Sequence, residues 1–197
     1  MGERGLVILD RDGVINEDSA DFVRTPEQWT PLAGSPEAIG RLCAAGFRIA
    51  VATNQSGIAR GYLDGPTLDA IHARMRAALA AHGAHLACIA WCPHGPDDGC
   101  ACRKPEPGLL RLIGRQLGTT LAGVPFVGDS ARDLEAARAA GCEPVLVRTG
   151  NGARTEALPA AAGVRVFDDL AAFADAHLSR SAPSDPAGGA SSETGRC

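Results

Sequence analysis

The sequence is poor in aromatic residues and has no excess of basic charge, and these shortages exclude several classes of function. Only 4% of the 197 residues are Phe, Trp or Tyr, and tyrosine occurs once. Such a chain offers no platform for stacking bases. Its formal net charge of −4 produces no field that attracts a polyanion. We therefore expect no nucleic acid among its partners.

Long apolar runs are also missing. No stretch reaches the roughly 20 apolar residues that cross a bilayer, and the initial MGERGLVILD lacks the length and cleavage site of a secretory signal. We therefore expect a cytoplasmic protein that contacts no membrane. The seven cysteines are not expected to form disulfides in that reducing compartment, so metal binding or core packing explains them better.

The chain alternates between strand-like and helix-like segments. Apolar runs predict strands at 6–9, 47–53, 85–91, 124–128, 144–148 and, more weakly, 164–167. Helices are predicted between them at 35–46, 66–83, 107–118, 131–141 and 169–177. Ser35 is expected to cap the first helix, and glycines at 46, 83, 118 and 141 to end helices. This order predicts an α/β fold, a doubly wound, Rossmann-like parallel sheet with helices on both faces.

The predicted domain spans residues 1–178, and residues 179–197 are expected to be a disordered tail. This tail is rich in Ser, Gly, Pro and Ala and has no apolar periodicity. It leaves Cys197 as an exposed thiol without an evident role. The sequence contains no repeat and no pattern typical of a dimer seam, so a monomer is the default expectation.

Polar side chains follow three of the predicted strands, namely Asp10 and Asp12, then Thr53 and Asn54, then Asp129, Ser130 and Asp133. Ligands of parallel sheets bind outside the carboxyl ends of strands, so the three groups should meet at one edge. Carboxylates there suit Mg²⁺ and phosphoryl transfer, with Asp10 and Asp129 as the natural ligands. Each group alone could be a helix cap, as Asp129-Ser130 or Asp133 would be, but three groups at one edge favour a site.

Four stretches, DRDGVIN, TNQSG, CRKPEPG and GDSARD, resemble in order and spacing the four motifs of the haloacid dehalogenase-like (HAD) phosphatases. The resemblance covers about residues 5–178. It implies a magnesium-dependent phosphatase that works through an aspartyl-phosphate intermediate. It also implies the following roles: Asp10 as nucleophile, Asp12 as general acid and base, Thr53 and Lys104 as phosphoryl ligands, Asp10, Asp129 and the Asp12 carbonyl as magnesium ligands, and Asp133 as their support.

A second cluster lies in WCPHGPDDGCACRKP and contains Cys92, His94, Cys100 and Cys102. Three thiolates and one imidazole form a closed, tetrahedral zinc set of the structural type, and PDDG provides the turn that folds the loop back. Unpaired core cysteines or a redox pair are the alternatives for this cluster. The other cysteines within apolar patterns, Cys43, Cys88 and Cys142, are expected in the core.

The spacing leaves no room for a large cap domain, either between Asp12 and the first helix or between Thr53 and the cysteine loop. We therefore expect an open site in which the zinc-binding loop supplies selectivity. Zinc would fix this loop so that Lys104 reaches the phosphoryl group and Arg103 reaches another part of the substrate.

Within the HAD family, the stretches DRDGVINEDSADFV, TNQSGIARGY and IHARMRAAL and the cysteine loop are similar to enzymes that remove the 7-phosphate of heptose 1,7-bisphosphate. That reaction serves the synthesis of ADP-heptose for lipopolysaccharide core. Histidinol-phosphate phosphatases share the motifs and are the alternative, although GIARGY favours the heptose branch. The resemblance implies substrate contacts from Asp18, Ser19, Ala20, Asp21, Thr53, Asn54, Gln55, Ser56, Arg103 and Lys104.

One departure concerns Phe22, which lies near the place of a tyrosine in many heptose enzymes. The resemblance therefore does not extend to the sugar-hydroxyl contacts or the choice of anomer. A bisphosphate also needs a second anion site, for which Arg103 is the first candidate and Arg60 the second. Two other classes of function are open. One is a non-catalytic zinc-loop module, which would not need Asp10, and the other is a phosphatase of proteins or nucleic acids, which the net charge disfavours.

Overall fold

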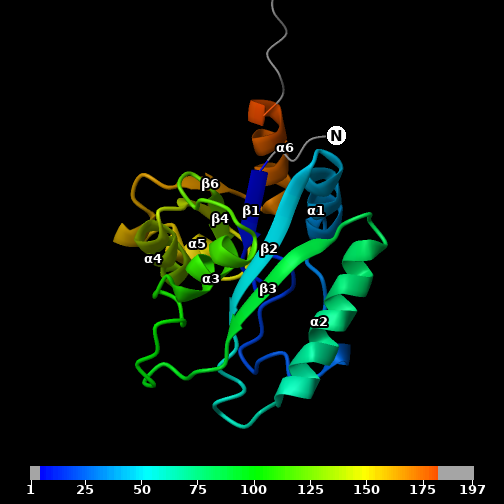
Figure 1. Ribbon diagram of the computed structural model, residues 1–197, viewed down its shortest axis with the longest axis vertical. Coiled ribbons are helices and arrows are strands. Elements are labelled where there is room, and N and C mark those ends of the chain that lie inside the picture. The colour runs from blue at the N-terminus through cyan, green and yellow to red at the C-terminus, as the bar shows by residue number, and fades with distance from the viewer. Residues whose placement is uncertain (1–4, 182–197) are drawn as a thin grey trace, which may run out of the picture.

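The computed structural model describes residues 5–181, which form one parallel sheet between two layers of helices (Figure 1). The strands are β1 (Gly5–Leu9), β2 (Phe47–Asn54), β3 (Leu86–Cys92), β4 (Pro125–Gly128), β5 (Glu143–Val147) and β6 (Arg165–Phe167). Their order is β3-β2-β1-β4-β5-β6, and all neighbours are parallel. This is the doubly wound order with its switch point between β1 and β4, which confirms the predicted fold class.

The helices are α1 (Ser35–Ala44), α2 (Gly65–Ala80), α3 (Gly108–Gln116), α4 (Ala131–Ala140), α5 (Gly152–Thr155) and α6 (Leu170–Ser181), with short 3₁₀ turns η1 (Pro26–Gln28) and η2 (Pro159–Ala161). Helices α1, α2 and α6 cover one face of the sheet, and α3 and α4 cover the other (Figure 1). Between residues 5 and 181, no helix is both long and apolar enough to cross a membrane. No large cap domain interrupts the order of strands and helices in this range.

The central strand β1 explains why LVIL is continuously apolar. Val7 and Leu9 pack in the core under α1, α2 and α6, whereas Leu6 and Ile8 pack in the core under α3 and α4. All four are at most 3% exposed, because alternate side chains of a strand point to opposite faces and both faces are covered. Strand β1 meets β4 over a short ladder, Ile8 with Phe126 and Leu9 with Val127.

The start of α1 differs from the prediction. Gly34 is the N-cap, with φ of 78°, and Ser35 is the first helical residue. The Ser35 hydroxyl donates to the Val14 carbonyl at 2.8 Å instead of capping the helix. The predicted cap at Ser35 is therefore wrong, because a left-handed turn at Gly34 begins the helix and the hydroxyl ties α1 to the loop after β1.

Two further predictions need correction. Helix α6 continues through Ser181, past the boundary predicted at 178, and the rest of the predicted tail, with Cys197, lies outside the described residues. Cys142 is buried as predicted, but Cys43 and Cys88 are only half-buried at the margins of the two cores. Their sulfurs lie near polar partners, the His85 carbonyl and the Gln116 amide oxygen.

Candidate active site

A cavity of about 300 Å³ opens at the carboxyl ends of the central strands. Figure 1 shows these strand ends at the lower end of the sheet. Its acidic lining consists of Asp10, Asp12, Asp18, Asp129 and Asp133, and its basic lining of Arg11, Arg60, Arg103, Lys104 and Arg132. The three polar groups predicted to meet at one edge do so. The cavity therefore places an acidic floor next to basic groups, as an anionic ligand bound with a cation requires.

Asp10 directly follows β1 and is 8% exposed. Its backbone N–H donates to the Val127 carbonyl at 2.8 Å, which extends the β1–β4 pairing by one step. Oδ1 of its carboxylate accepts from Arg11 N at 2.7 Å and lies 2.8 Å from Lys104 Nζ. Burial, with the charges of Asp133 and Asp129, raises the pKa of Asp10 well above its ordinary value, although Lys104 acts in the opposite direction.

Lys104 is 2% exposed, so its charge depends on its neighbours. Its Nζ lies 2.8 Å from Asp10, 2.7 Å from Asp133 and 2.9 Å from the Ala52 carbonyl. Burial lowers the pKa of Lys104, but the two acids outweigh it and leave the pKa above its ordinary value. The Asn54 side-chain amide donates to the Lys104 carbonyl and accepts from the Lys104 N–H, each at 3.0 Å. Asn54 therefore fixes Lys104 to the end of β2.

Asp133 is fully buried in the first turn of α4. One carboxylate oxygen binds Lys104, and the other accepts from the Ser130 N–H at 3.0 Å and the Ser130 hydroxyl at 2.6 Å. Burial raises its pKa, but Lys104 and Ser130 together lower the pKa below its ordinary value. Asp133 thus holds both the start of α4 and the lysine, as a capping acid does.

Asp129 follows β4 in a tight cradle. Asn151 donates to its Oδ2 from the backbone at 2.8 Å and from the side chain at 3.2 Å. A Cβ on Gly13 or Gly150 would lie 2.2 or 2.3 Å from the same oxygen, and both glycines have positive φ. Only glycine fits at these two positions. Burial and the Asp133 charge raise the pKa of Asp129 to about 6.

Asp12 faces the cavity with a side chain that is 24% exposed, and three residues hold its carboxylate. Arg11 binds it through Nε at 3.1 Å and Nη2 at 2.8 and 2.9 Å. Asn16 and Gln55 donate to it at 2.9 and 3.0 Å. Burial raises the pKa of Asp12, but Arg11 and these amides hold the pKa below its ordinary value. Gln55 also donates to the Thr53 hydroxyl at 2.8 Å.

The acids can hold a hard divalent cation. Asp10, Asp129 and Asp133 each offer an oxygen, and these oxygens lie within 4.8 Å of one another. The protein contacts of Asp10 use Oδ1 and those of Asp129 use Oδ2, so among the described residues the second oxygen of each is left for a ligand. A cation there would offset the like charges that raise the pKa values of both groups. The donor set therefore fits Mg²⁺, which prefers carboxylate oxygens.

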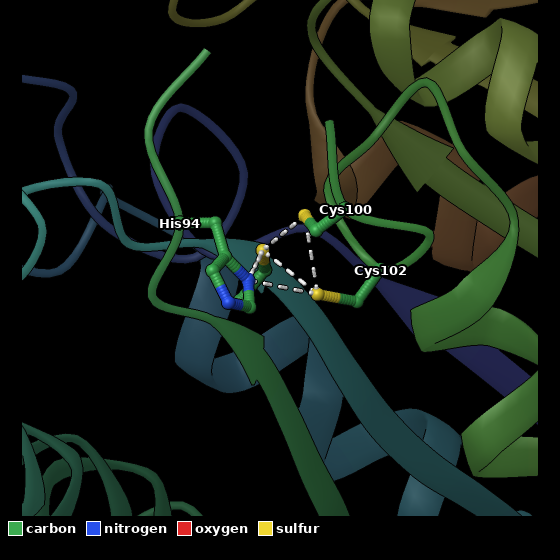
Figure 2. Close-up of side chains that lie close together, drawn as sticks. His94, Cys100 and Cys102 are labelled. Carbon is green, nitrogen blue, oxygen red and sulfur yellow. Dashed lines mark hydrogen bonds between the residues drawn. The ribbon is translucent and has the colours of Figure 1, made fainter. Parts of the chain in front are cut away.

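The predicted zinc ligands come together after β3. Figure 2 shows His94, Cys100 and Cys102 converging, and with Cys92 they offer ligand atoms that all lie within 4.8 Å of one another. The Sγ–Sγ separations are 3.1, 3.5 and 3.6 Å, and His94 Nδ1 lies 3.4 and 3.3 Å from Cys92 and Cys102. Tetrahedral zinc with Zn–S bonds of about 2.3 Å holds sulfurs about 3.8 Å apart, somewhat farther than the separations here. The geometry therefore fits zinc bound through the Nδ1 atom of His94.

Most of the predicted substrate contacts line the cavity, namely Asp18, Ser19, Thr53, Asn54, Gln55, Ser56, Arg103 and Lys104. Ala20 and Asp21 do not line it and are exposed beside it. The sequence argument missed Arg11, Arg132 and Asn151. The turn sequence Gly150-Asn151-Gly152 after β5 is the signal that could have indicated Asn151, because β5 ends at the same edge of the sheet.

Comparisons with known proteins agree with this geometry. The HAD-hydrolase-like family matches residues 101–173. A curated D-glycero-beta-D-manno-heptose-1,7-bisphosphate 7-phosphatase of Pseudomonas aeruginosa is 59% identical over 175 residues, which are 89% of this chain and 98% of the relative. One from Bordetella bronchiseptica is 57% identical over 173 residues, 86% of this chain and 96% of the relative.

Solved structures give the same result. The crystal structure of D,D-heptose 1,7-bisphosphate phosphatase from B. bronchiseptica, complexed with magnesium and phosphate, has a TM-score of 0.85 and 56% identity, covering 89% of this chain and 98% of that one. The corresponding phosphatase from Burkholderia thailandensis has a TM-score of 0.68 and 44% identity, covering 88% and 98%. The fold, the arrangement of the acids and this identity over nearly the full length of the relatives place the chain in the HAD-like family of D-glycero-β-D-manno-heptose-1,7-bisphosphate 7-phosphatases.

Proposed function

We propose that the protein hydrolyses the 7-phosphate of D-glycero-D-manno-heptose 1,7-bisphosphate in a magnesium-dependent reaction, giving heptose 1-phosphate and inorganic phosphate. The observation that carries the proposal is the contact of Lys104 with both Asp10 and Asp133 beside Asp129, at the switch point of the sheet. The relatives named for this reaction support it, as does the Bordetella structure with magnesium and phosphate. We propose the β-anomer as substrate because the curated relatives are named for it.

Asp10 and Asp129 would hold Mg²⁺ with the Asp12 backbone carbonyl, and Asp133 would support them through Lys104. When bound, the ion offsets the repulsion between the attacking carboxylate and the phosphoryl group and polarises the phosphoryl oxygens. Gly13 and Gly150 leave the space that the Asp129 carboxylate occupies, because a Cβ at either position would clash with its Oδ2.

Asp10 acts as the nucleophile in this proposal. An oxygen of its carboxylate forms a bond to phosphorus as the bond from phosphorus to the sugar O7 breaks, which leaves an aspartyl-phosphate. Lys104, already 2.8 Å from Asp10, balances charge on the phosphoryl oxygens, and Thr53 is directed into the same cavity. Water then attacks phosphorus and releases phosphate from Asp10.

Asp12 moves the protons. Its carboxylate is anionic in the free protein because of Arg11, so a monoanionic phosphate ester supplies the proton that Asp12 passes to the departing O7 oxygen. In the second half-reaction Asp12 accepts a proton from the attacking water. Its partly exposed side chain at the cavity suits both transfers.

The second phosphate needs cations at the mouth of the cavity. Arg103, Arg60 and Arg132 line the cavity, and burial, followed by the Arg132 charge, lowers the pKa of Arg103. Arg103 Nη1 donates to the His94 carbonyl at 3.1 Å, which ties it to the cysteine loop. We assign the 1-phosphate to Arg103, with Arg60 and Arg132 nearby, because guanidinium groups bind phosphate in a bidentate manner.

A structural zinc ion at Cys92, His94, Cys100 and Cys102 completes the proposal. With four protein ligands it has no open position for catalysis, and it would hold Arg103 and Lys104, which follow Cys102 directly. We propose that the protein acts in the cytoplasm, where phosphorylated sugars are made, and that its reaction serves the synthesis of lipopolysaccharide core. We propose a monomer that acts on small soluble phosphates and contacts neither nucleic acid nor membrane.

The test compares kcat/KM for the two anomers of heptose 1,7-bisphosphate, heptose 7-phosphate, histidinol phosphate and a phosphopeptide, with magnesium and without it. We expect the β-bisphosphate to exceed all others and to require magnesium. An equal or higher value for histidinol phosphate would reject the substrate assignment. An equal value for heptose 7-phosphate would reject the second anion site at Arg103.

A further inference from the structure

Arg11 lies between the two aspartates of DRD, yet its side chain points into the protein and is 1% exposed. A buried guanidinium needs an acidic partner, because its unpaired charge would be costly in the interior. Asp12 is that partner, with three contacts of 2.8–3.1 Å, and Nη2 also donates to Gln55 Oε1 at 3.1 Å. Although Arg11 belongs to the cavity lining, its guanidinium is therefore occupied by Asp12 and Gln55.

This contact fixes the direction of the Asp12 carboxylate. The guanidinium fork binds both carboxylate oxygens, with Asn16 on one and Gln55 on the other. Gln55 also joins the Thr53 hydroxyl. A general acid has to lie within hydrogen-bond reach of the leaving oxygen, so its direction decides how well it protonates that oxygen.

A second observation concerns two buried polar atoms. Arg11 Nη1 and the Nε2 of His72, on helix α2, are both buried and lack a hydrogen-bond partner among the described residues. His72 is 6% exposed. Burial, then the Arg11 and Arg76 charges, lower the pKa of His72 to about 4, so that its ring is neutral near pH 7. A neutral imidazole offers an acceptor, and Nη1 is a donor, so the two orphaned atoms are complementary.

We propose that His72 and Arg11 form a buried support that positions Asp12 for proton transfer, with His72 Nε2 accepting from Arg11 Nη1 through one buried water. Buried donors and acceptors without partners are rare, and internal water commonly joins them. His72 does not line the cavity, and the Arg11 side chain, although part of the lining, is only 1% exposed. In this proposal both act through Asp12, which makes them positioning residues. The inference rests on the proposed phosphatase mechanism, but it concerns how Asp12 is held, whichever sugar phosphate is the substrate.

The test uses the dependence of rate on the leaving group. An alkyl phosphate needs its leaving oxygen protonated, whereas 2,4-dinitrophenyl phosphate leaves without help. We expect His72→Leu and Arg11→Met to lower kcat/KM, which reports the steps up to release of the leaving group, at least tenfold for the sugar phosphate and less than threefold for the aryl phosphate. Arg11→Lys should rescue only partly, because one ammonium cannot reproduce the fork. His72→Gln, whose amide end can occupy the place of Nε2, should restore most of the lost rate.

Met75→Leu is the matched control, since Met75 is fully buried on the same helix and belongs to the apolar core. It should change both rates equally and little. A double-mutant cycle provides the second measurement, in which His72→Leu or Arg11→Met should cause no further loss in the Asp12→Asn background. Equal losses on both substrates, or losses that multiply with Asp12→Asn, would overturn the inference. If heptose bisphosphate is not a substrate, the same comparison on any alkyl phosphate that is hydrolysed still decides it.

Discussion

Asp129, the acid proposed to bind magnesium, should destabilise the magnesium-free protein, and replacing it should raise the free energy of unfolding. Asp129 is 3% exposed, and its pKa rises from 3.8 to about 6 on folding. A shift of about 2 units corresponds to a cost of about 3 kcal/mol at pH 7, because each unit is about 1.4 kcal/mol. Asp129→Asn removes the charge and keeps an oxygen that accepts from Asn151. We expect its free energy of unfolding without magnesium to rise by up to about 3 kcal/mol.

The pH dependence follows from the direction of the shift. A carboxyl group whose folded pKa lies above its unfolded pKa binds more protons in the folded state. Its cost is therefore absent below about pH 4, grows between pH 4 and 6, and is complete above pH 6. The advantage of Asp129→Asn should be about zero at pH 4 and largest at pH 7, where it corresponds to about 6–12 °C in Tm.

The assay is urea unfolding at pH 4, 5, 6 and 7 in magnesium-free buffer, with zinc content checked by atomic absorption. Magnesium should stabilise the natural protein at pH 7 and leave Asp129→Asn unchanged, since the variant lacks a ligand. Asp69→Asn, at an exposed position of α2, is the control and should show neither effect. An Asp129→Asn protein that is less stable at pH 7, or that magnesium stabilises as much as the parent, would refute the reasoning.

Three further predictions concern the same machinery. Asp10→Asn should abolish turnover and phosphoenzyme formation while zinc content and cooperative unfolding are kept, and steady-state activity in this variant would count against the nucleophile. Gly13→Ala should lower activity more than a hundredfold and destabilise the fold by about 1–3 kcal/mol, because its Cβ would lie 2.2 Å from Asp129 Oδ2 at a φ of +80°; normal magnesium-dependent kinetics would contradict the cradle. Removing zinc with a chelator and then restoring magnesium should lower both kcat and Tm, and full activity at an unchanged Tm would reject the structural role of the cysteine loop.

The sequence was sufficient for the fold because its signals are local and repeated. Six apolar runs and five helical stretches match elements of the structure. Gly46, Gly83, Gly118 and Gly141 follow helices with positive φ as predicted. The four-motif order also predicted which side chains the β-strand ends would bring together. The predicted N-cap at Ser35 was wrong because the Ser35 hydroxyl donates to the carbonyl of Val14, a residue of a distant loop that no local pattern reveals.

The contacts behind the catalytic groups could not be predicted in this way. Arg11 reads as a polar residue in a loop, and only the three-dimensional fold shows that it is buried against Asp12. Asn54 lines the cavity, and the sequence did not reveal that its amide also binds the backbone of Lys104, fifty residues along the chain. Asn151 reaches Asp129 from the end of β5. Such long-range hydrogen bonds leave no spacing that a single sequence reveals.

The short ladder between β1 and β4 should affect the proposed magnesium site and the proposed zinc site differently. The residues of the proposed zinc centre all lie between 92 and 102, within one half of the sheet. Asp10 and Asp129 instead lie at the ends of β1 and β4, which are joined by the pairs Ile8–Phe126 and Leu9–Val127 and by the bond from the Asp10 N–H to the Val127 carbonyl. If the halves part along this seam, the acids separate while the cysteines stay together. Mg²⁺ affinity should therefore report whether β1 and β4 remain paired, whereas zinc content should not.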